Sequence, residues 1–238
     1  MKHQSSKELE SLRFDYRRAA HYAGQDAIKS MNYTFEDLME HFPAFLGHMS
    51  LSRVLGLYEL YKQTLGVAGH IAEVGVFKGG SFLLFAKLVK IFENESLTQV
   101  HGFDWFKGME PDEMNTKVER GSYSESYERI CELVKVQNLE NIALIHQMDV
   151  RSELSEFLES YQSLQFKLVF LDAGMYDVVK SCLPLFWERL TPGGILVLDQ
   201  FNHVLSPGET KAVREFLPNA KVRTIPNIWM PSGYIVKE

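Results

Sequence analysis

The fold of this chain is decided by residues 70–81, H-I-A-E-V-G-V-F-K-G-G-S. A short apolar run leads into a glycine-rich turn, and residues 81–93 then carry apolar side chains at helical spacing. A strand that passes through such a turn into a helix is typical of an open α/β sheet, in which ligands bind beyond the carboxyl ends of the strands. We therefore expect a ligand at this turn.

The pattern continues downstream as an alternation of apolar runs and amphipathic stretches. The apolar runs are residues 99–104, 141–147, 166–172 and 195–199, and the helical stretches between them are 124–136, 151–161 and 177–190. Strand followed by helix predicts a parallel sheet with crossover connections. After a helix start at S-P-G-E, residues 206–209, two closing strands at 222–225 and 229–236 are close enough to pair antiparallel. The prediction is an α/β fold with a mostly parallel seven-stranded sheet and an antiparallel last strand.

The residues before this core predict helices. Between positions 51 and 65, apolar side chains recur at close to the helical period. We expect residues 1–66 to form a helical N-terminal extension that acts as a lid, and residues 67–238 to form a single core.

Composition excludes several classes of partner. The chain has 238 residues, 25 Lys and Arg against 31 Asp and Glu, and a net charge of −6, with the basic residues scattered. This argues against binding to nucleic acid or to an anionic membrane surface. The most apolar stretch, residues 81–92, is interrupted by Lys87 and Lys90, and the first residues, MKHQSSKELE, lack the apolar core of a signal peptide. We expect a cytoplasmic protein that acts on a small molecule, as a monomer or a homo-oligomer.

The turn itself favours one kind of ligand. Its glycines, Gly75, Gly79 and Gly80, let the backbone turn sharply and let a ligand approach the main chain. They do not form the G-x-G-x-x-G dinucleotide fingerprint. The carboxylate of Glu73 would repel a pyrophosphate and suits a ligand that carries positive charge, such as S-adenosylmethionine. Ser81 can cap the helix that follows. The alternative is a tight turn with a solvated glutamate.

Acidic residues also follow the next two predicted strands. Asp104 can accept hydrogen bonds from both hydroxyls of a ribose. Asp149 can meet the amino group of an adenine. Trp105, Phe106 and Trp229 either offer aromatic faces to a sugar or an adenine or belong to the core. The long polar stretch at 110–127 interrupts the strand and helix pattern, so it is either a binding loop or a variable surface excursion.

Four segments, in this order, carry a resemblance to a known family. They are E-V-G-V-F-K-G-G-S at 73–81, F-D-W-F-K-G-M at 103–109, L-D-A-G-M-Y at 171–176 and L-T-P-G-G-I-L-V-L-D-Q-F at 190–201. Together they resemble class I S-adenosylmethionine-dependent methyltransferases, and more narrowly the macrocin O-methyltransferase type, which methylates sugar hydroxyls. The resemblance runs from Gly47 to the C-terminus. It implies a Rossmann-like fold, S-adenosylmethionine as cofactor and a sugar-like acceptor. The cofactor contacts that it implies are Met49, Glu73, Gly75, Val76, Phe77, Gly79, Ser81, Asp104, Trp105, Asp149, Val150 and Asp172.

Two positions depart from the family pattern. The family holds a divalent metal with the first Asp of D-x-D and two adjacent acids of a later motif, and it uses the second Asp of D-x-D as the base. Here Asp172 and Asp199 match, but Gly174 replaces the base and Gln200 replaces an acid. The resemblance then implies Asp172, Asp199 and Gln200 as ligands of a weakly bound Mg²⁺ at most.

The sequence leaves three candidate functions. The first is a methyltransferase in which Asp172 and His203 serve catalysis, with a sugar or another small molecule as acceptor. The second is a protein that binds S-adenosylmethionine without catalysis. The third, a nucleotide-dependent oxidoreductase, is disfavoured by Glu73 and by the glycine spacing.

Overall fold

The computed structural model describes residues 19–204, 206–226, 228 and 230–238. The chain divides into two compact units, with the boundary between Leu55 and Gly56. The described part of the first unit is helical, with residues 19–29, α2 (Phe35–Glu40), α3 (Phe42–Phe45) and the beginning of α4 (His48–Gln63). Thr34 and Asp37 form a capping box that starts α2. The helical extension predicted to end at residue 66 thus divides at Leu55, and the rest of α4 belongs to the second unit.

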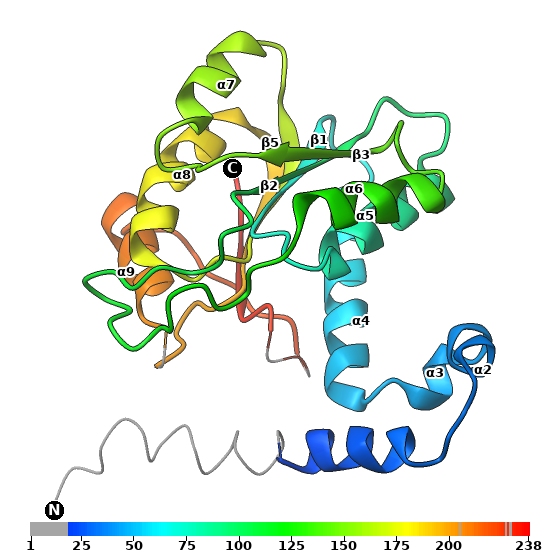
Figure 1. Cartoon of the computed structure of the whole chain (residues 1–238). Coiled ribbons are helices and arrows are strands. Elements are labelled where there is room, and N and C mark those ends of the chain that lie inside the picture. The colour runs from blue at the N-terminus through cyan, green and yellow to red at the C-terminus, as the bar shows by residue number, and fades with distance from the viewer. Residues whose placement is uncertain (1–18, 205, 227, 229) are drawn as a thin grey trace, which may run out of the picture. The chain divides into compact units, whose positions relative to one another are not determined.

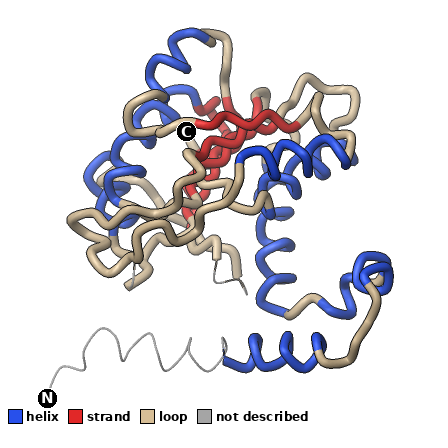
Figure 2. The backbone as a smooth tube through the Cα atoms, viewed as in Figure 1, coloured by secondary structure: helices blue, strands red, loops and turns tan. Residues whose placement is uncertain are grey.

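The second unit contains one six-stranded sheet in the order β3-β2-β1-β4-β5-β6 (Figures 1 and 2). Its strands are β1 (His70–Val74), β2 (Val100–Asp104), β3 (Ala143–Gln147), β4 (Phe166–Leu171), β5 (Leu190–Leu198) and β6 (Gly233–Val236). All neighbours pair parallel except β5 and β6, which pair antiparallel. The predicted α/β fold with an antiparallel last strand is confirmed.

The predicted count of seven strands is wrong for the described residues. The segment at 222–225 contributes a single antiparallel bridge, in which Arg223 and Tyr234 exchange two backbone hydrogen bonds of 2.8 Å. Pro226 and Pro231 lie in the sequence between this bridge and β6, and a proline cannot donate a hydrogen bond to a ladder. The closing pair is therefore shortened to β6 and one bridge.

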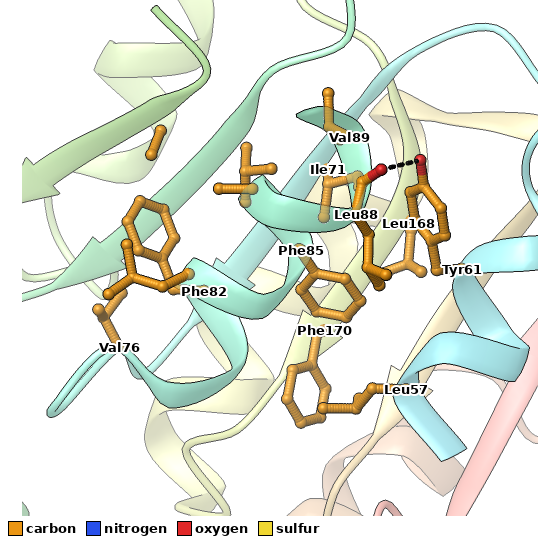
Figure 3. Packing of buried hydrophobic residues seen from close by; sticks show 14 of the residues in the cluster. Leu57, Tyr61, Ile71, Val76, Phe82, Phe85, Leu88, Val89, Leu168 and Phe170 are labelled. Atoms are coloured by element: carbon orange, nitrogen blue, oxygen red, sulfur yellow. Dashed lines mark hydrogen bonds between the residues drawn. The ribbon is translucent and has the colours of Figure 1, made fainter. Parts of the chain in front are cut away.

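Helices cover both faces of the sheet. They are α5 (Gly80–Phe92), α6 (Tyr127–Val136), α7 (Leu154–Ser160), α8 (Tyr176–Arg189) and α9 (Gly208–Phe216). The side chains of β4 alternate: Leu168 and Phe170 pack with α4, α5 and α6, while Val169 and Leu171 pack with α7, α8 and α9. Figure 3 shows the first of these clusters around α5. None of the described helices is both long and apolar enough to cross a membrane.

Two buried histidines lie side by side on neighbouring strands. His101 Nδ1 of β2 and His146 Nε2 of β3 are 3.0 Å apart, and the ring of His146 stacks on Phe103 with centroids 4.8 Å apart. Burial, together with the neighbouring His146 and His70, lowers the pKa of His101 to about 3, and burial lowers the pKa of His146 to about 4. Both imidazoles are therefore neutral at physiological pH.

This pair predicts a loss of stability in mild acid. Below pH 6.5 these histidines become protonated in the unfolded chain but stay neutral in the folded chain. The free energy of unfolding therefore falls as the pH drops toward 4. At pH 5 the loss is about 2 kcal/mol for each histidine, from about 1.5 pH units at 1.36 kcal/mol each. Urea unfolding at pH 7.5 and pH 5 measures it. His146→Phe keeps the ring stack and is expected to halve the loss, whereas an equal pH dependence in both proteins would contradict the neutral pair.

Candidate functional site

The predicted site residues lie at one edge of the sheet. Val74 of β1 is level with Phe103 of β2 and with Leu171 of β4, and Leu171 is level with Leu198 of β5. The residues that follow these four positions therefore emerge together: Gly75, Asp104, Asp172 and Asp199. The chain order reverses between β1 and β4, which is where open α/β sheets bind ligands.

A glycine at position 75 is required for the packing of β1 against the end of β4. Its φ is +93°, and a Cβ atom on it would overlap the backbone carbonyl oxygen of Asp172. The glycine therefore lets β1 and the end of β4 approach each other. The next residue, Val76, is buried in the α5 side of the core, and Phe77 follows with φ +48°.

Glu73 and Ser81 bind each other. Glu73 is fully buried, and the Ser81 hydroxyl donates a 2.6 Å hydrogen bond to its Oε1 atom. The alternative of a solvated glutamate is therefore wrong. The prediction that Ser81 caps the helix is also wrong, because α5 begins at Gly80 and Ser81 lies inside its first turn.

The amino end of α5 is open. Its N-cap residue is Gly79, at φ +78°, and no side chain among the described residues caps it. A Cβ atom on Gly80 would meet no atom within 4 Å. The free N–H groups and the helix dipole favour a negatively charged group at such an end.

Asp104 is held in one orientation at the end of β2. Its Oδ2 atom accepts a 2.9 Å hydrogen bond from the backbone N–H of Phe77, and its Oδ1 atom accepts one of 2.7 Å from Phe106. A carboxylate oxygen has a second lone pair, so both oxygens of this half-buried side chain can still accept from a ligand diol.

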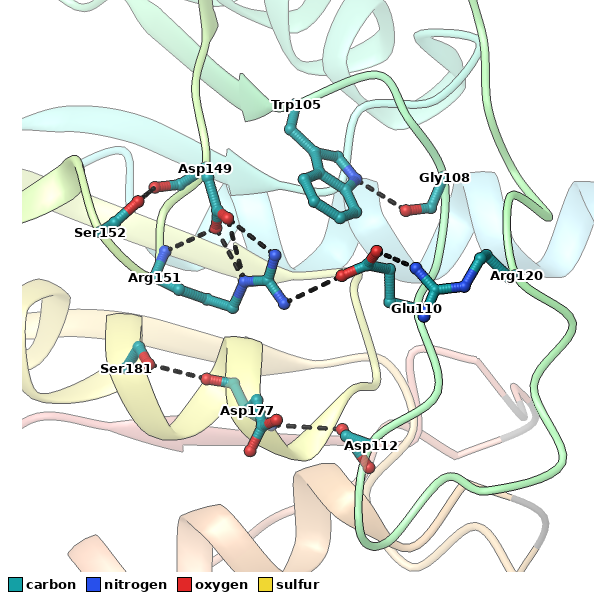
Figure 4. A network of polar contacts seen from close by, with 10 residues as sticks. All are labelled: Trp105, Gly108, Glu110, Asp112, Arg120, Asp149, Arg151, Ser152, Asp177 and Ser181. Atoms are coloured by element: carbon teal, nitrogen blue, oxygen red, sulfur yellow. Dashed lines mark hydrogen bonds and ion pairs between the residues drawn. The ribbon is translucent and has the colours of Figure 1, made fainter.

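Asp149 belongs to an ionic network that the sequence did not predict (Figure 4). Arg151 donates to both of its carboxylate oxygens, at 2.9 Å from Nε and 2.7 Å from Nη2, and these bonds hold the pKa of Asp149 below its usual range. The Arg151 guanidinium lies 4.7 Å from the ring centroid of Trp105 and also pairs with Glu110, which pairs in turn with Arg120. The adenine contact predicted for Asp149 would share its carboxylate with Arg151. Val150, beside it, is buried.

The long loop after β2 is fastened to the loops after β4 and β5. Asn115 is buried, and its Nδ2 atom donates to the carbonyl oxygen of Gly174 at 3.3 Å and to Ser206 Oγ at 3.1 Å. Asp112 Oδ2 accepts from the backbone N–H of Asp177 at 3.2 Å, as Figure 4 shows. The loop is therefore part of the site edge. An isolated asparagine in a polar stretch carries no periodic signal, so Asn115 was not predicted.

A buried glutamate supports the turn after β5. Glu209, in the first turn of α9, is fully buried, and its Oε2 atom accepts a 2.7 Å hydrogen bond from the backbone N–H of Gln200. Burial and then the nearby charge of Asp199 raise the pKa of Glu209 well above its usual value. The S-P-G-E motif predicted a capping box with Pro207 at the first helical position. In the structure α9 begins at Gly208 with Pro207 as the N-cap, and Glu209 reaches Gln200 and does not close a capping box.

The remaining predicted residues are placed as follows. Asp172 and Asp199 end adjacent strands, and His203 lies in the turn after β5, where its N–H donates to the carbonyl oxygen of Gln200 at 3.1 Å. No group of three or more His, Cys, Asp or Glu side chains in the described part of the chain is arranged to hold a metal ion. Met49 lies near the start of α4, in the first compact unit, and its cofactor contact stays a prediction.

Comparison with known proteins gives consistent matches. The family model described as a methyltransferase domain matches residues 72–201. Mycinamicin III 3''-O-methyltransferase from Micromonospora griseorubida is 23% identical over 214 residues, which cover 85% of this chain and 83% of that protein. The structure of the calicheamicin methyltransferase CalS11 matches with a TM-score of 0.79 and 24% identity over 98% of this chain and 94% of that one. The O-methyltransferase NovP matches with a TM-score of 0.67 and 16% identity over 81% and 83%. The two structures show that the fold is shared.

Proposed function

The chain belongs to the methyltransferase domain family, and we propose that it transfers a methyl group from S-adenosylmethionine to a hydroxyl group of a sugar. The observation that carries this proposal is the fixed carboxylate of Asp104 beside the open amino end of α5. A ribose diol fits the first and a methionine carboxylate fits the second. The absence of a G-x-G-x-x-G motif from the sequence disfavours a dinucleotide.

The other predicted cofactor residues surround these two groups. Gly75, Val76 and Phe77 form the turn between them, and Glu73 supplies a buried carboxylate behind it. Trp105, Asp149 and Val150 lie on the side of β2 and β3, where we place the adenine. S-adenosylmethionine supplies a methyl group on a positively charged sulfur, so the donor is already activated. The chain must then align the acceptor oxygen and remove its proton.

We assign the acceptor side to the ends of β4 and β5. As the acceptor oxygen bonds to the methyl carbon, the carbon–sulfur bond breaks and the hydroxyl proton passes to His203 or Asp172. Asp172 follows β4 and His203 follows β5, and these strands lie on the other side of β1 from the proposed adenine side at β2 and β3. An imidazole nitrogen and a carboxylate oxygen are both able to accept the proton.

The sugar acceptor rests on the relative and on the resemblance. The curated relative, by its name, methylates mycinamicin III, and the match extends over most of both chains. The structural neighbour CalS11 is described as a TDP-rhamnose 3'-O-methyltransferase. The test is therefore incubation with S-adenosylmethionine and two probes, mycinamicin III and TDP-rhamnose, with mass spectrometry of the products. A methylated sugar is the expected result.

Gly174 favours a second candidate function, because it lacks the base that the family pattern places there. The second candidate is a protein that binds S-adenosylmethionine without transferring its methyl group. Calorimetric binding of S-adenosylmethionine together with no methyl release in single-turnover experiments would favour it.

Replacing Asp104 by alanine is expected to weaken S-adenosylmethionine binding by about 1.5–3 kcal/mol, the range for a hydrogen bond to a charged group. This corresponds to about a 10- to 150-fold higher Kd. Titration calorimetry measures the change, and a thermal melt shows whether the variant is folded. Asp177→Ala removes an exposed carboxylate and is the matched control. Unchanged affinity in a folded Asp104→Ala protein would contradict the proposed ribose contact.

We also propose that metal dependence is weak or absent. Asp172 and Asp199 can supply two carboxylates, and the third position is the neutral Gln200. Methyl transfer is expected to continue in EDTA and to change little when Mg²⁺ is added back. Complete loss of activity on chelation, with full recovery on adding Mg²⁺, would show that Gln200 is an adequate ligand.

A further inference from the structure

We propose that Gln200 binds a hydroxyl group of the acceptor sugar other than the one that is methylated, and that its amide does so from the space that a side chain at position 174 would otherwise fill. This inference rests on the proposed function and names the group that holds its acceptor. Its basis is the geometry of the loops after β4 and β5.

The amide of Gln200 occupies the room beside Gly174. Gly174 is buried and has a φ of +62°. A Cβ atom on it would overlap Gln200 Oε1 and would lie 2.6 Å from Cδ of the same side chain. A side chain at position 174 would therefore require the Gln200 amide to move from its present place. The two departures from the family pattern thus concern one shared space between the ends of β4 and β5.

The amide oxygen of Gln200 is able to accept a hydrogen bond from a ligand. Gln200 Oε1 is buried and accepts no hydrogen bond from any described residue. The backbone of Gln200 is held on both sides, because its N–H donates to Glu209 Oε2 at 2.7 Å and its carbonyl oxygen accepts from the N–H of His203 at 3.1 Å. A buried acceptor without a donor is unfavourable, so a donor supplied by a ligand is favoured there.

The polar groups around the Gly174 carbonyl are already engaged. Asn115 Nδ2 donates to the carbonyl oxygen of Gly174 and to Ser206 Oγ, and Ser206 Oγ donates to the same carbonyl at 3.1 Å. These bonds fix three loops around Gly174 and leave the Gln200 amide oxygen as the acceptor. Because this oxygen carries no net charge, it suits a neutral hydroxyl donor.

The position also agrees with the proposed placement of the cofactor. Asp104 follows β2, and Gln200 lies near the end of β5, on the other side of β1 and β4 in the strand order. An acceptor sugar bound to Gln200 would enter from the side opposite to the adenine. This is the arrangement that a crevice at the reversal of strand order provides.

The first experiment removes the acceptor atom. Gln200→Met keeps the length of the side chain and loses the amide. Its KM for whichever probe the wild type methylates, TDP-rhamnose or mycinamicin III, is expected to rise about tenfold with kcat little changed. The affinity for S-adenosylhomocysteine is expected to stay the same, which a general disruption of the site would not allow.

The second experiment tests the shared space without any acceptor. Gly174→Ala in the wild type is expected to lower the Tm, because the new methyl group displaces the Gln200 amide. In a Gln200→Ala background the same substitution is expected to lower the Tm much less. Gly121→Ala is the matched control for backbone strain, because Gly121 has φ +82° and a Cβ atom on it would meet no atom within 4 Å.

The possible results of these experiments test the shared space, the role of Gln200 and the proposed function separately. Additive effects of Gly174→Ala and Gln200→Ala on the Tm would overturn the shared space. Methylation of a probe by the wild type with an unchanged KM in Gln200→Met would overturn the role of Gln200 and leave the proposed function standing. Methylation of neither probe by the wild type would overturn the proposed function and this inference with it.

Discussion

Lys167→Met is expected to lower the free energy of unfolding by about 3–5 kcal/mol, because it leaves the carboxylate of Glu93 buried without its partner. Lys167, in β4, is almost completely buried, and its Nζ atom lies 2.5 Å from Glu93 Oε2. Tyr61 donates a 2.7 Å hydrogen bond to the other oxygen of Glu93, and burial followed by this hydrogen bond raises the pKa of Tyr61. The network joins α4, the end of α5 and β4 at the edge of the sheet away from the site.

Urea unfolding of the variant and the wild type measures this effect. Lys62→Met is the matched control, because Lys62 forms an exposed ion pair with Glu59 at 3.2 Å and such pairs contribute little. The double variant Lys167→Met with Glu93→Gln is expected to recover part of the loss, since it leaves no unpaired buried charge. Equal losses for Lys167→Met and Lys62→Met would contradict the buried network.

The same lysine shows what sequence patterns predict and what they miss. The run F-K-L-V-F-L at 166–171 predicts a buried strand, and β4 covers those residues. The run gives no information on the partner of Lys167, because Glu93 lies 74 residues away in the sequence. Periodicity depends on neighbours along the chain, so it predicts the elements and their buried faces. It does not predict pairs that only the folded chain brings together.

The residues of the candidate site also divide into those that local sequence patterns predict and those that they do not. The acids at the strand ends were predicted, because a strand followed by a turn leaves a local pattern and parallel strands end at one edge. Asn115 was not predicted, because its partner Gly174 lies 59 residues away in the sequence. The bonds of Arg151 to Asp149 and of Gln200 to Glu209 are local, at separations of 2 and 9 residues, but they belong to turns that carry no periodic signal. The Gly174 and Gln200 departures were visible in the sequence as two substitutions, but only the structure shows that they share one space.

The sequence singled out Gly75 correctly, but the structure gives a different reason for a glycine at this position. The sequence suggested that this glycine leaves room for a ligand to approach the backbone. In the structure, the room is taken by the carbonyl oxygen of Asp172, and the N–H of Asp172 donates to the carbonyl oxygen of Val74 at 2.9 Å. Gly75 therefore holds β1 against the end of β4, and the open space for a ligand lies further along the turn, at Gly80.

Gly75→Val is consequently expected to destabilise the fold as well as to abolish S-adenosylmethionine binding. Valine at φ +93° carries backbone strain of about 1–3 kcal/mol, and its overlap with the Asp172 carbonyl adds an overpacking cost of about 1–3 kcal/mol. A total of about 2–6 kcal/mol should be visible in urea unfolding. Gly80→Val separates the two effects, because a side chain there enters open space at the amino end of α5. We expect Gly80→Val to unfold like the wild type and to bind S-adenosylmethionine more weakly. Wild-type stability in Gly75→Val would contradict the β1–β4 contact, and wild-type affinity in Gly80→Val would contradict the placement of the cofactor at this helix.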